Sequence, residues 1–124
     1  MISMVKFIDA NIFIQRWSNP QIAAFLNTLN PEEHATSVLV LAEVYDKMEL
    51  KKLTHAFSYI RGLMGALTVF PIIQDDLFWA IKNPLPLRIN DRLHLAVMKR
   101  NNIQVLISYD ADFDHDKSMI REEL

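Results

Sequence analysis

The sequence predicts an α/β protein, a three-layer α/β/α fold with a mostly parallel central sheet. Short apolar runs that suit buried strands alternate along the chain with amphipathic segments that suit helices. Strands separated by helices are joined by right-handed crossovers, which leave the sheet between layers of helices. The chain has 124 residues, 51% of them hydrophobic, so we expect a single domain over residues 1–124 with an ample core.

The first half of the chain is expected to contain two strands and four helices. Pro20 suits the first turn of a helix, because proline lacks the N–H group that this turn leaves unbonded, and Ser18 or Asn19 can cap it. Pro31 ends the same helix. The expected elements are a strand over residues 4–8, a helix from residue 11, a helix from residue 20 that ends before residue 30, a strand over residues 34–38, and helices over residues 40–50 and 54–67.

The second half repeats this alternation. We expect Asn90 to cap an amphipathic helix, and Asn101 and Asn102 to close it in the left-handed conformation that glycine usually supplies. Acidic residues at positions 75 and 76 suit the start of another helix. The expected elements are a strand over residues 68–73, helices over residues 75–81 and 91–99, and a strand over residues 103–107.

Composition excludes several classes of protein and site. Without cysteine there are no disulfides, no thiolate nucleophiles and none of the usual structural zinc sites, which fits a cytoplasmic protein. Gly62 and Gly65 are the only glycines, so a P-loop and a dinucleotide fingerprint are missing. No apolar run approaches the roughly 20 residues of a membrane span, and we find no secretory signal at the start.

The net charge of −2 does not decide whether the protein binds nucleic acid. Nucleic-acid-binding proteins usually carry a basic excess, whereas this chain has 13 basic and 15 acidic residues. If four of the acids gather around bound cations, however, the rest of the molecule holds 11 acids and is slightly basic.

Three acidic residues are expected at the same edge of the sheet. Asp9 and Asp110 each follow an apolar strand, and the carboxyl ends of parallel strands point the same way. Asp91 begins the helix that leads into the last strand, which places it on the same side. The simpler alternative for the first position is that Asp9 or Asn11 only caps the following helix.

Glu43 lies inside the apolar stretch VLVLAEVY, where a carboxylate is costly unless a partner compensates it. One such partner is Lys47, at i+4 on the same helix. The other is a cation shared with Asp9, Asp91 and Asp110, because clustered carboxylates repel one another and offer the oxygen ligands that Mg²⁺ or Mn²⁺ prefers. One or two such ions can activate a water and stabilise the leaving oxygen of a phosphodiester, which is nuclease chemistry.

Three segments resemble the motifs of one known family. FIDANIF, SVLVLAEVY and INDRLHLAVMKRNNIQVLISYDADF resemble, in order and spacing, the motifs of PIN domains, close in size to the VapC-like ribonuclease toxins. The resemblance covers nearly the whole chain and implies that Asp9, Glu43, Asp91 and Asp110 are the metal-binding and catalytic acids. It implies supporting roles for three further residues, namely Asn11, Ser108 and Asp112, and Ser37 stands at the polar start of the second motif. The chain departs from the family pattern by having Ala10 for a frequent Thr and Asn101-Asn102 for the usual glycine.

The resemblance implies an endoribonuclease that depends on Mg²⁺ or Mn²⁺ and leaves a 5′-phosphate on RNA. It also suggests that the protein is the toxin of a toxin–antitoxin pair, with an antitoxin protein as its partner. The alternative is a non-catalytic PIN-like module that binds RNA or a protein. An aspartate-nucleophile phosphatase fits less well, because Asn11 stands where its general acid would be.

Other polar and apolar residues have less specific interpretations. We expect His94 to be a packed or surface histidine rather than part of the site, and the acidic run at residues 112–116 to be a solvated loop rather than a second metal site. Apolar surface on several helices predicts a homodimer. Four basic residues are candidates for guiding phosphates, unless they are ordinary surface charge: Arg16, Lys47, Arg88 and Arg92.

Overall fold

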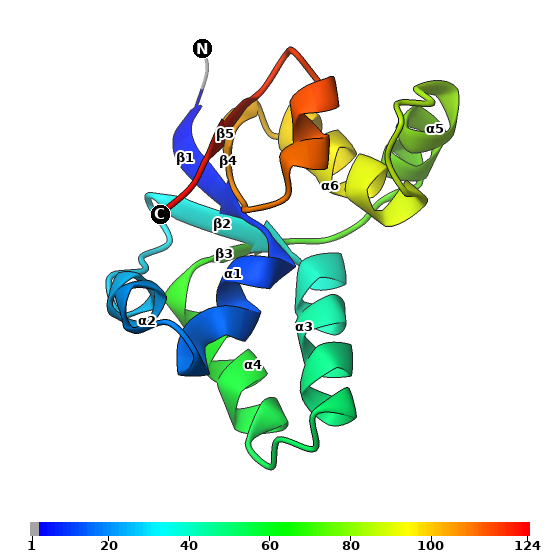
Figure 1. The fold of residues 1–124 in the computed structure, drawn as a ribbon. Helices are drawn as coiled ribbons and strands as arrows, with labels where there is room; N and C mark the ends of the chain where they lie inside the picture. Colours follow the sequence, from blue (N-terminus) through cyan, green and yellow to red (C-terminus); the bar gives the residue numbers. More distant parts are fainter. Residues whose placement is uncertain (1–2) are drawn as a thin grey trace.

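The computed structural model describes residues 3–124 and contains one five-stranded sheet in which every neighbouring pair is parallel. The strand order is β3-β2-β1-β4-β5 (Figure 1). The predicted three-layer α/β/α fold is confirmed, and its sheet is fully parallel. The strands are β1 (Ser3–Ile8), β2 (His34–Ser37), β3 (Thr68–Phe70), β4 (Ile103–Ile107) and β5 (Ile120–Glu122).

The handedness of the crossovers determines on which face of the sheet each helix lies. The chain moves from β1 to β2 to β3 in one direction and then crosses back to β4 and β5, so right-handed connections place the two sets of helices on opposite faces. In Figure 1, α1, α3 and α4 lie on one side of the sheet, and α5, α6 and η2 lie on the other. The first set is α1 (Ala10–Ile14), the 3-10 helix η1 (Gln15–Trp17), α2 (Pro20–Leu26), α3 (Val38–Leu50) and α4 (Ala56–Ala66). The second set is α5 (Gln74–Lys82), α6 (Ile89–Arg100) and the 3-10 helix η2 (Ala111–His115).

The strand order reverses its direction between β1 and β4, at the centre of the sheet. In open α/β sheets, ligands bind beside the carboxyl ends of the strands at this kind of reversal. Ile8 pairs with Ile107 at the last position of both strands, so Asp9 and Ser108 emerge side by side. Register therefore brings together two chain segments that lie almost a hundred residues apart.

The core lies on both faces of the two central strands. Phe7 and Leu106 are fully buried, as the central position of β1 and β4 requires. Val44 of α3 covers one face and Leu95 of α6 covers the other. Among residues 3–124, no helix is long and apolar enough to cross a bilayer.

The residues at the helix ends confirm some of the predicted helix caps and contradict others. Asn19, not Ser18, caps α2, since its side chain accepts from the N–H groups of the helix's second and third residues at 3.0 and 3.3 Å. Asn102 takes the predicted left-handed conformation, with φ of 57°, whereas the same prediction for Asn101 was wrong, because its φ is −103°. The prediction that Asn90 caps a helix was wrong, because α6 begins at Ile89 and Arg88 is its N-cap, without a side-chain hydrogen bond. Asn90 is thus the second residue of the helix.

Element boundaries differ from the predicted ones by a few residues. β2 ends at Ser37, one residue early, because the Ser37 hydroxyl caps α3 by accepting from the Val40 N–H at 3.2 Å. β3 ends at Phe70, directly before Pro71, which has no N–H for the sheet. The sequence analysis missed β5, which adds an edge strand beside β4.

Candidate functional site

Asp9 lies at the carboxyl end of β1 and is only 6% exposed. Its Oδ1 accepts from the Ala10 N–H at 2.8 Å, so Asp9 does cap α1, as the simpler interpretation had it. Its Oδ2 accepts from the Ser108 hydroxyl at 2.7 Å and from Asn11 Nδ2 at 3.0 Å. Burial raises the pKa of Asp9 even though these hydrogen bonds favour its ionised form. Capping thus accounts for one oxygen only, while the other joins a network across two strands.

Asn11 and Ser108 tie the ends of β1 and β4 together. The Asn11 amide donates to Ser108 Oγ at 3.2 Å, and its carbonyl oxygen accepts from the Tyr109 N–H at 3.4 Å. Ser108 Oγ also accepts from the Asp110 N–H at 3.0 Å. The chain that carries Asp110 is therefore fixed to the chain that carries Asp9.

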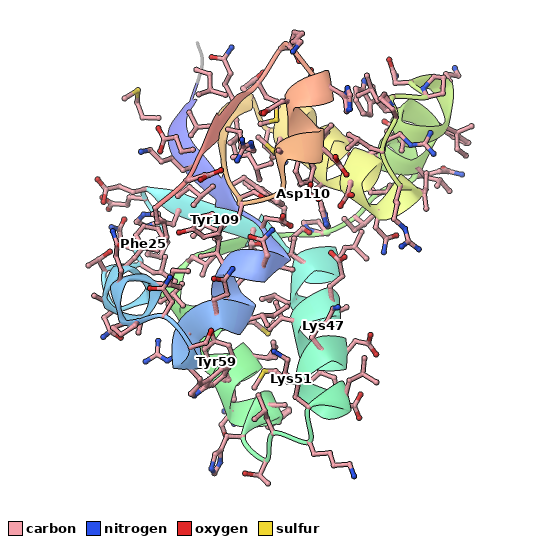
Figure 2. The ribbon with its side chains drawn as sticks, in the orientation of Figure 1. Phe25, Lys47, Lys51, Tyr59, Tyr109 and Asp110 are labelled. Carbon is pink, nitrogen blue, oxygen red and sulfur yellow. The ribbon has the colours of Figure 1, made fainter. Side chains whose placement is uncertain are left out.

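Asp110 follows β4 and caps η2, accepting from the Asp112 N–H at 2.9 Å. Figure 2 shows it where the chain passes from the sheet into η2, on the same side as the upper end of α3. Asp112 itself is exposed and joins this arrangement through its backbone.

Glu43 and His94 meet where α3 approaches α6. Glu43 Oε1 lies 2.7 Å from His94 Nε2, and the His94 side chain is fully buried, whereas that of Glu43 is 32% exposed. The two atoms are close, but their alignment falls short of hydrogen-bond geometry. His94 rather than Lys47 is thus the near partner of Glu43. The expectation that His94 would be packed is confirmed, but the expectation that it would stay apart from the acids was wrong.

Asp91 lies in the first turn of α6, one turn before His94. Burial raises the pKa of Asp91 to about 6. His94 opposes this rise, whereas the charges of Asp9, Asp110 and Glu43 add to it. All four predicted acids are therefore close enough to influence one carboxyl group.

This pKa predicts a pH dependence of stability in metal-free protein. A carboxyl with a raised pKa binds a proton in the folded state that the unfolded state has already lost, so stability falls as the pH rises through about 6. Between pH 5 and pH 7 we expect wild type to lose about 1 kcal/mol more than Asp91→Asn, after discounting for partial exposure of the group. Urea unfolding in EDTA at both pH values measures this difference. An equal pH dependence in the two proteins would contradict it.

The donor chemistry of the four acids fits a hard divalent cation, since all the candidate ligands are carboxylate oxygens. The four side chains are not arranged as they would be in an assembled metal site. Within residues 3–124, no group of three or more histidine or acidic side chains is arranged to hold a metal ion. Convergence of the four carboxylates on one ion thus stays a prediction.

A cavity of about 350 Å³ lies between α3 and the start of α6 and is lined by two of the four acids, Glu43 and Asp91. It includes two of the predicted phosphate-guiding residues and one acid, Asp46, that was not predicted from the sequence. Asp46 follows Glu43 by three positions on the same helix, which is the spacing that could have revealed it. The lining residues are Glu43, Asp46, Lys47, Arg88, Ile89, Asn90 and Asp91.

A sequence model of the PIN domain matches residues 6–117. The chain belongs to the PIN domain family. This match spans most of the chain and includes all four acids. No curated protein matches the sequence.

Solved structures of low sequence identity share the fold of this PIN domain. A toxin–antitoxin complex from Klebsiella pneumoniae contains a chain that is 20% identical, with a TM-score of 0.74 over 96% of this chain and 99% of that one. VapC20 of Mycobacterium tuberculosis, named a sarcin–ricin loop cleaving toxin, is 19% identical, with a TM-score of 0.72 over 88% of this chain and 92% of its own. DNA-bound VapBC from Salmonella typhimurium is 16% identical, with a TM-score of 0.73 over 99% and 98%.

The four basic residues that are candidates for guiding phosphates fall into two groups. Lys47 and Arg88 line the cavity beside the acids. Arg92 instead donates to the Ala80 carbonyl in α5 at 2.7 Å, and Arg16 lies 5.9 Å from the centre of the Tyr59 ring. Only the first pair is placed to meet a phosphate near the acids.

The prediction of a solvated loop over residues 112–116 was wrong in part, because residues 111–115 form η2 and Asp116 is only 8% exposed. Asp114 accepts from Arg121 at 2.9 and 3.1 Å, and this ion pair lowers the pKa of Asp114. Asp116 lies 3.1 Å from Lys99 and accepts from the Ser118 hydroxyl at 2.6 Å. These contacts fasten η2 and the following loop, so neither acid is available as a ligand for a second metal ion.

Proposed function

We propose that this PIN domain is an endoribonuclease that depends on Mg²⁺ or Mn²⁺. The observation that carries the proposal is that Asp9 and Asp110 follow the two neighbouring strands at the reversal point of the sheet, with Glu43 and Asp91 near enough that the other three acids add to the rise that burial causes in the pKa of Asp91. Carboxylates gathered at the reversal point of a parallel sheet repel one another, and a divalent cation would convert that repulsion into binding. Cytoplasmic RNA is the substrate in this proposal.

The four acids would hold the cation, and their neighbours would hold the acids. Asp9, Glu43, Asp91 and Asp110 supply the oxygens, and a bound divalent ion supplies Lewis acidity and lowers the pKa of water. Asn11 and Ser108 fix the Asp9 carboxylate through hydrogen bonds of 3.0 and 2.7 Å. In this proposal a water would attack phosphorus, the bond from phosphorus to the 3′-oxygen would break, and the products would carry a 5′-phosphate and a 3′-hydroxyl. Asp112 serves as an accessory acid near Asp110.

RNA as the substrate class is supported by the cavity and by one structural neighbour. VapC20 is named for cleaving the sarcin–ricin loop, and we propose RNA cleavage for this chain as well. In the cavity, Lys47 and Arg88 stand beside Glu43 and Asp91. An RNA strand that presents a phosphate to the acids would thus meet two cations, which offset part of the repulsion from the remaining carboxylates.

Lys47→Met should weaken RNA binding more than Lys51→Met does. Both lysines are exposed on α3 or at its end, but only Lys47 lines the cavity, and Figure 2 shows Lys51 further from Asp110. We expect the Kd for a short single-stranded RNA to rise about threefold to tenfold, with a salt dependence shallower by about 0.7 for one lost phosphate contact. Fluorescence anisotropy in a cleavage-deficient Asp9→Asn background measures both quantities. Equal losses in the two lysine variants would mean that general surface charge, not the cavity, binds RNA.

Protein partners are a second part of the proposal. We propose a homodimer that an antitoxin protein inhibits, because apolar side chains line a groove between α3 and α4 and toxin–antitoxin complexes occur among the structural neighbours. Exposed members of this groove include Val38, Tyr45 and Met64. Burying such side chains against a second chain removes apolar surface from water.

Light scattering at micromolar concentration should therefore give about twice the mass of one chain. If this groove forms the dimer, Met64→Glu, which puts a charge into the groove, should give the mass of one chain. A strictly monomeric mass for wild type would contradict the homodimer but leave the proposed chemistry untouched.

The direct test of the proposed activity is cleavage of a mixed RNA pool by purified protein with Mn²⁺, and again with EDTA. We expect 5′-phosphorylated products with Mn²⁺ and none with EDTA. Cleavage that persists in EDTA would exclude the metal-dependent mechanism. RNA binding without cleavage under any condition would favour the non-catalytic PIN-like module instead.

A further inference from the structure

His94 is a fully buried polar side chain whose surroundings offer it one acidic contact. Its Nε2 lies 2.7 Å from Glu43 Oε1. Its Nδ1 is also buried, and no described residue gives either nitrogen a well-aligned hydrogen bond. The ring of Phe7 lies 6.2 Å away, centre to centre, which places His94 against the core side of β1. An imidazole in this position is costly for folding, because burial removes its water contacts.

The position of His94 on α6 relates it to the proposed metal site. Asp91 precedes it by three residues, so one helix face carries both an acidic ligand and the imidazole that reaches across to α3. His94 thus lies one helical turn from Asp91 on its own helix and contacts Glu43 of α3 directly.

We propose that His94 is a positioning residue that orients Glu43 toward the divalent cation. This inference rests on the proposed function. Nε2 lies 2.7 Å from the buried Oε1, which leaves Oε2 as the oxygen for a ligand, and Glu43 lines the cavity. Glu43 would hold the cation through Oε2 while His94 restrains the other oxygen, as groups behind metal ligands typically do.

A glutamate needs such a restraint more than an aspartate does. Its longer side chain has an additional rotatable bond, and fixing that bond during metal binding costs conformational entropy. Asp9 is already held by Ala10, Asn11 and Ser108. Glu43 has no comparable set of donors among the described residues, and His94 is the contact that restrains it.

The test compares Mn²⁺ affinity, by titration calorimetry, in wild type, His94→Leu and His94→Gln. Leucine fills most of the buried volume but cannot donate, whereas the glutamine amide can reach the position of Nε2. We expect the Kd for Mn²⁺ to rise about 10- to 100-fold in His94→Leu, the range typical when a residue that holds a metal ligand in place is lost. In His94→Gln it should stay within about threefold of wild type.

A double-mutant cycle with Glu43→Gln shows whether His94 acts through Glu43. In the Glu43→Gln background, His94→Leu should cause no further loss of Mn²⁺ affinity. A further loss there, or equal affinities in wild type and His94→Leu, would overturn the inference. Equal losses in His94→Leu and His94→Gln would also overturn it, because the donor would then be irrelevant.

Two controls separate this inference from folding and from the proposed function. Thermal unfolding in EDTA should show that each variant is folded. The Mn²⁺ affinities are then compared at a temperature at which all of the variants are folded. Absence of Mn²⁺ binding in wild type would overturn the metal-dependent function and the inference together. Normal Mn²⁺ binding and RNA cleavage in both wild type and His94→Leu would overturn the inference alone.

Discussion

Asp9→Asn should reduce RNA cleavage by about a thousandfold or more while leaving the fold intact. A metal ion contributes several kcal/mol to stabilising a phosphoryl transition state, and each 1.4 kcal/mol is about a factor of ten in rate. Asparagine keeps the shape of the side chain and one acceptor oxygen, but it removes a charged ligand from the centre of the network around Ser108. The measurement is cleavage of the same RNA pool with Mn²⁺ by wild type and variant.

Stability gives this variant an internal control. Burial raises the pKa of Asp9, so ionisation of this carboxyl costs more free energy in the folded protein than in the unfolded chain. Loss of that charge offsets the loss of hydrogen bonds to a carboxylate, and we expect the free energy of unfolding in EDTA to change by less than about 1 kcal/mol. Cleavage that continues unchanged in a folded Asp9→Asn protein would point to a contaminating nuclease and remove the basis for the mechanism.

Arg100→Met should destabilise the protein by about 2–4 kcal/mol, because it strands a buried carboxylate. Asp76 in α5 is 2% exposed and receives Nε of Arg100 at 2.9 Å and Nη2 at 3.1 Å. The same guanidinium donates to the Pro71 carbonyl at 2.8 Å. The pair fastens α5 to the end of α6, and methionine retains the volume of the side chain but not its charge. Urea unfolding at pH 7 measures the loss.

The matched control replaces both partners. Asp76→Asn combined with Arg100→Met removes the stranded charge, so the double variant should be more stable than Arg100→Met alone. Lys82→Met, at the exposed end of α5, should change stability by less than about 0.5 kcal/mol. If Arg100→Met were no more destabilising than Lys82→Met, the ion pair would contribute little to holding the two helices together.

The sequence was informative wherever a local signal coincided with burial. The apolar runs ending at Asp9 and before Ser108 are the two central strands, whose side chains must be hydrophobic on both faces. Asn19 and Asn102 also took the conformations that their side chains favour. Parallel strands then dictate that residues after the strands share an edge, which is why Asp9 and Asp110 could be placed together without a structure.

Features that depend on contacts across the fold could not be predicted in this way. β5 has three residues and an exposed Ile120, so it lacks a periodic apolar pattern. His94 looked like an ordinary helix residue, because only the packing of α6 against α3 brings it to Glu43. Asn90 is a good capping residue in isolation, yet the extended backbone of Arg88 starts α6 two residues earlier.

The contacts of β5 also set the order in which the proposed site can be completed. The N–H of Ser108 donates to the Glu122 carbonyl at 3.0 Å, and Arg121 donates back to the Ser108 carbonyl at 3.1 Å. The Tyr109 hydroxyl donates to the Leu124 carbonyl at 3.0 Å. During synthesis on a ribosome, the segment from Ser108 to Asp110 therefore lacks these restraints until residues 121–124 have left the exit tunnel. Asp9, Glu43 and Asp91 are synthesised before this segment, so Asp110 is the last of the four proposed acids to be held in place.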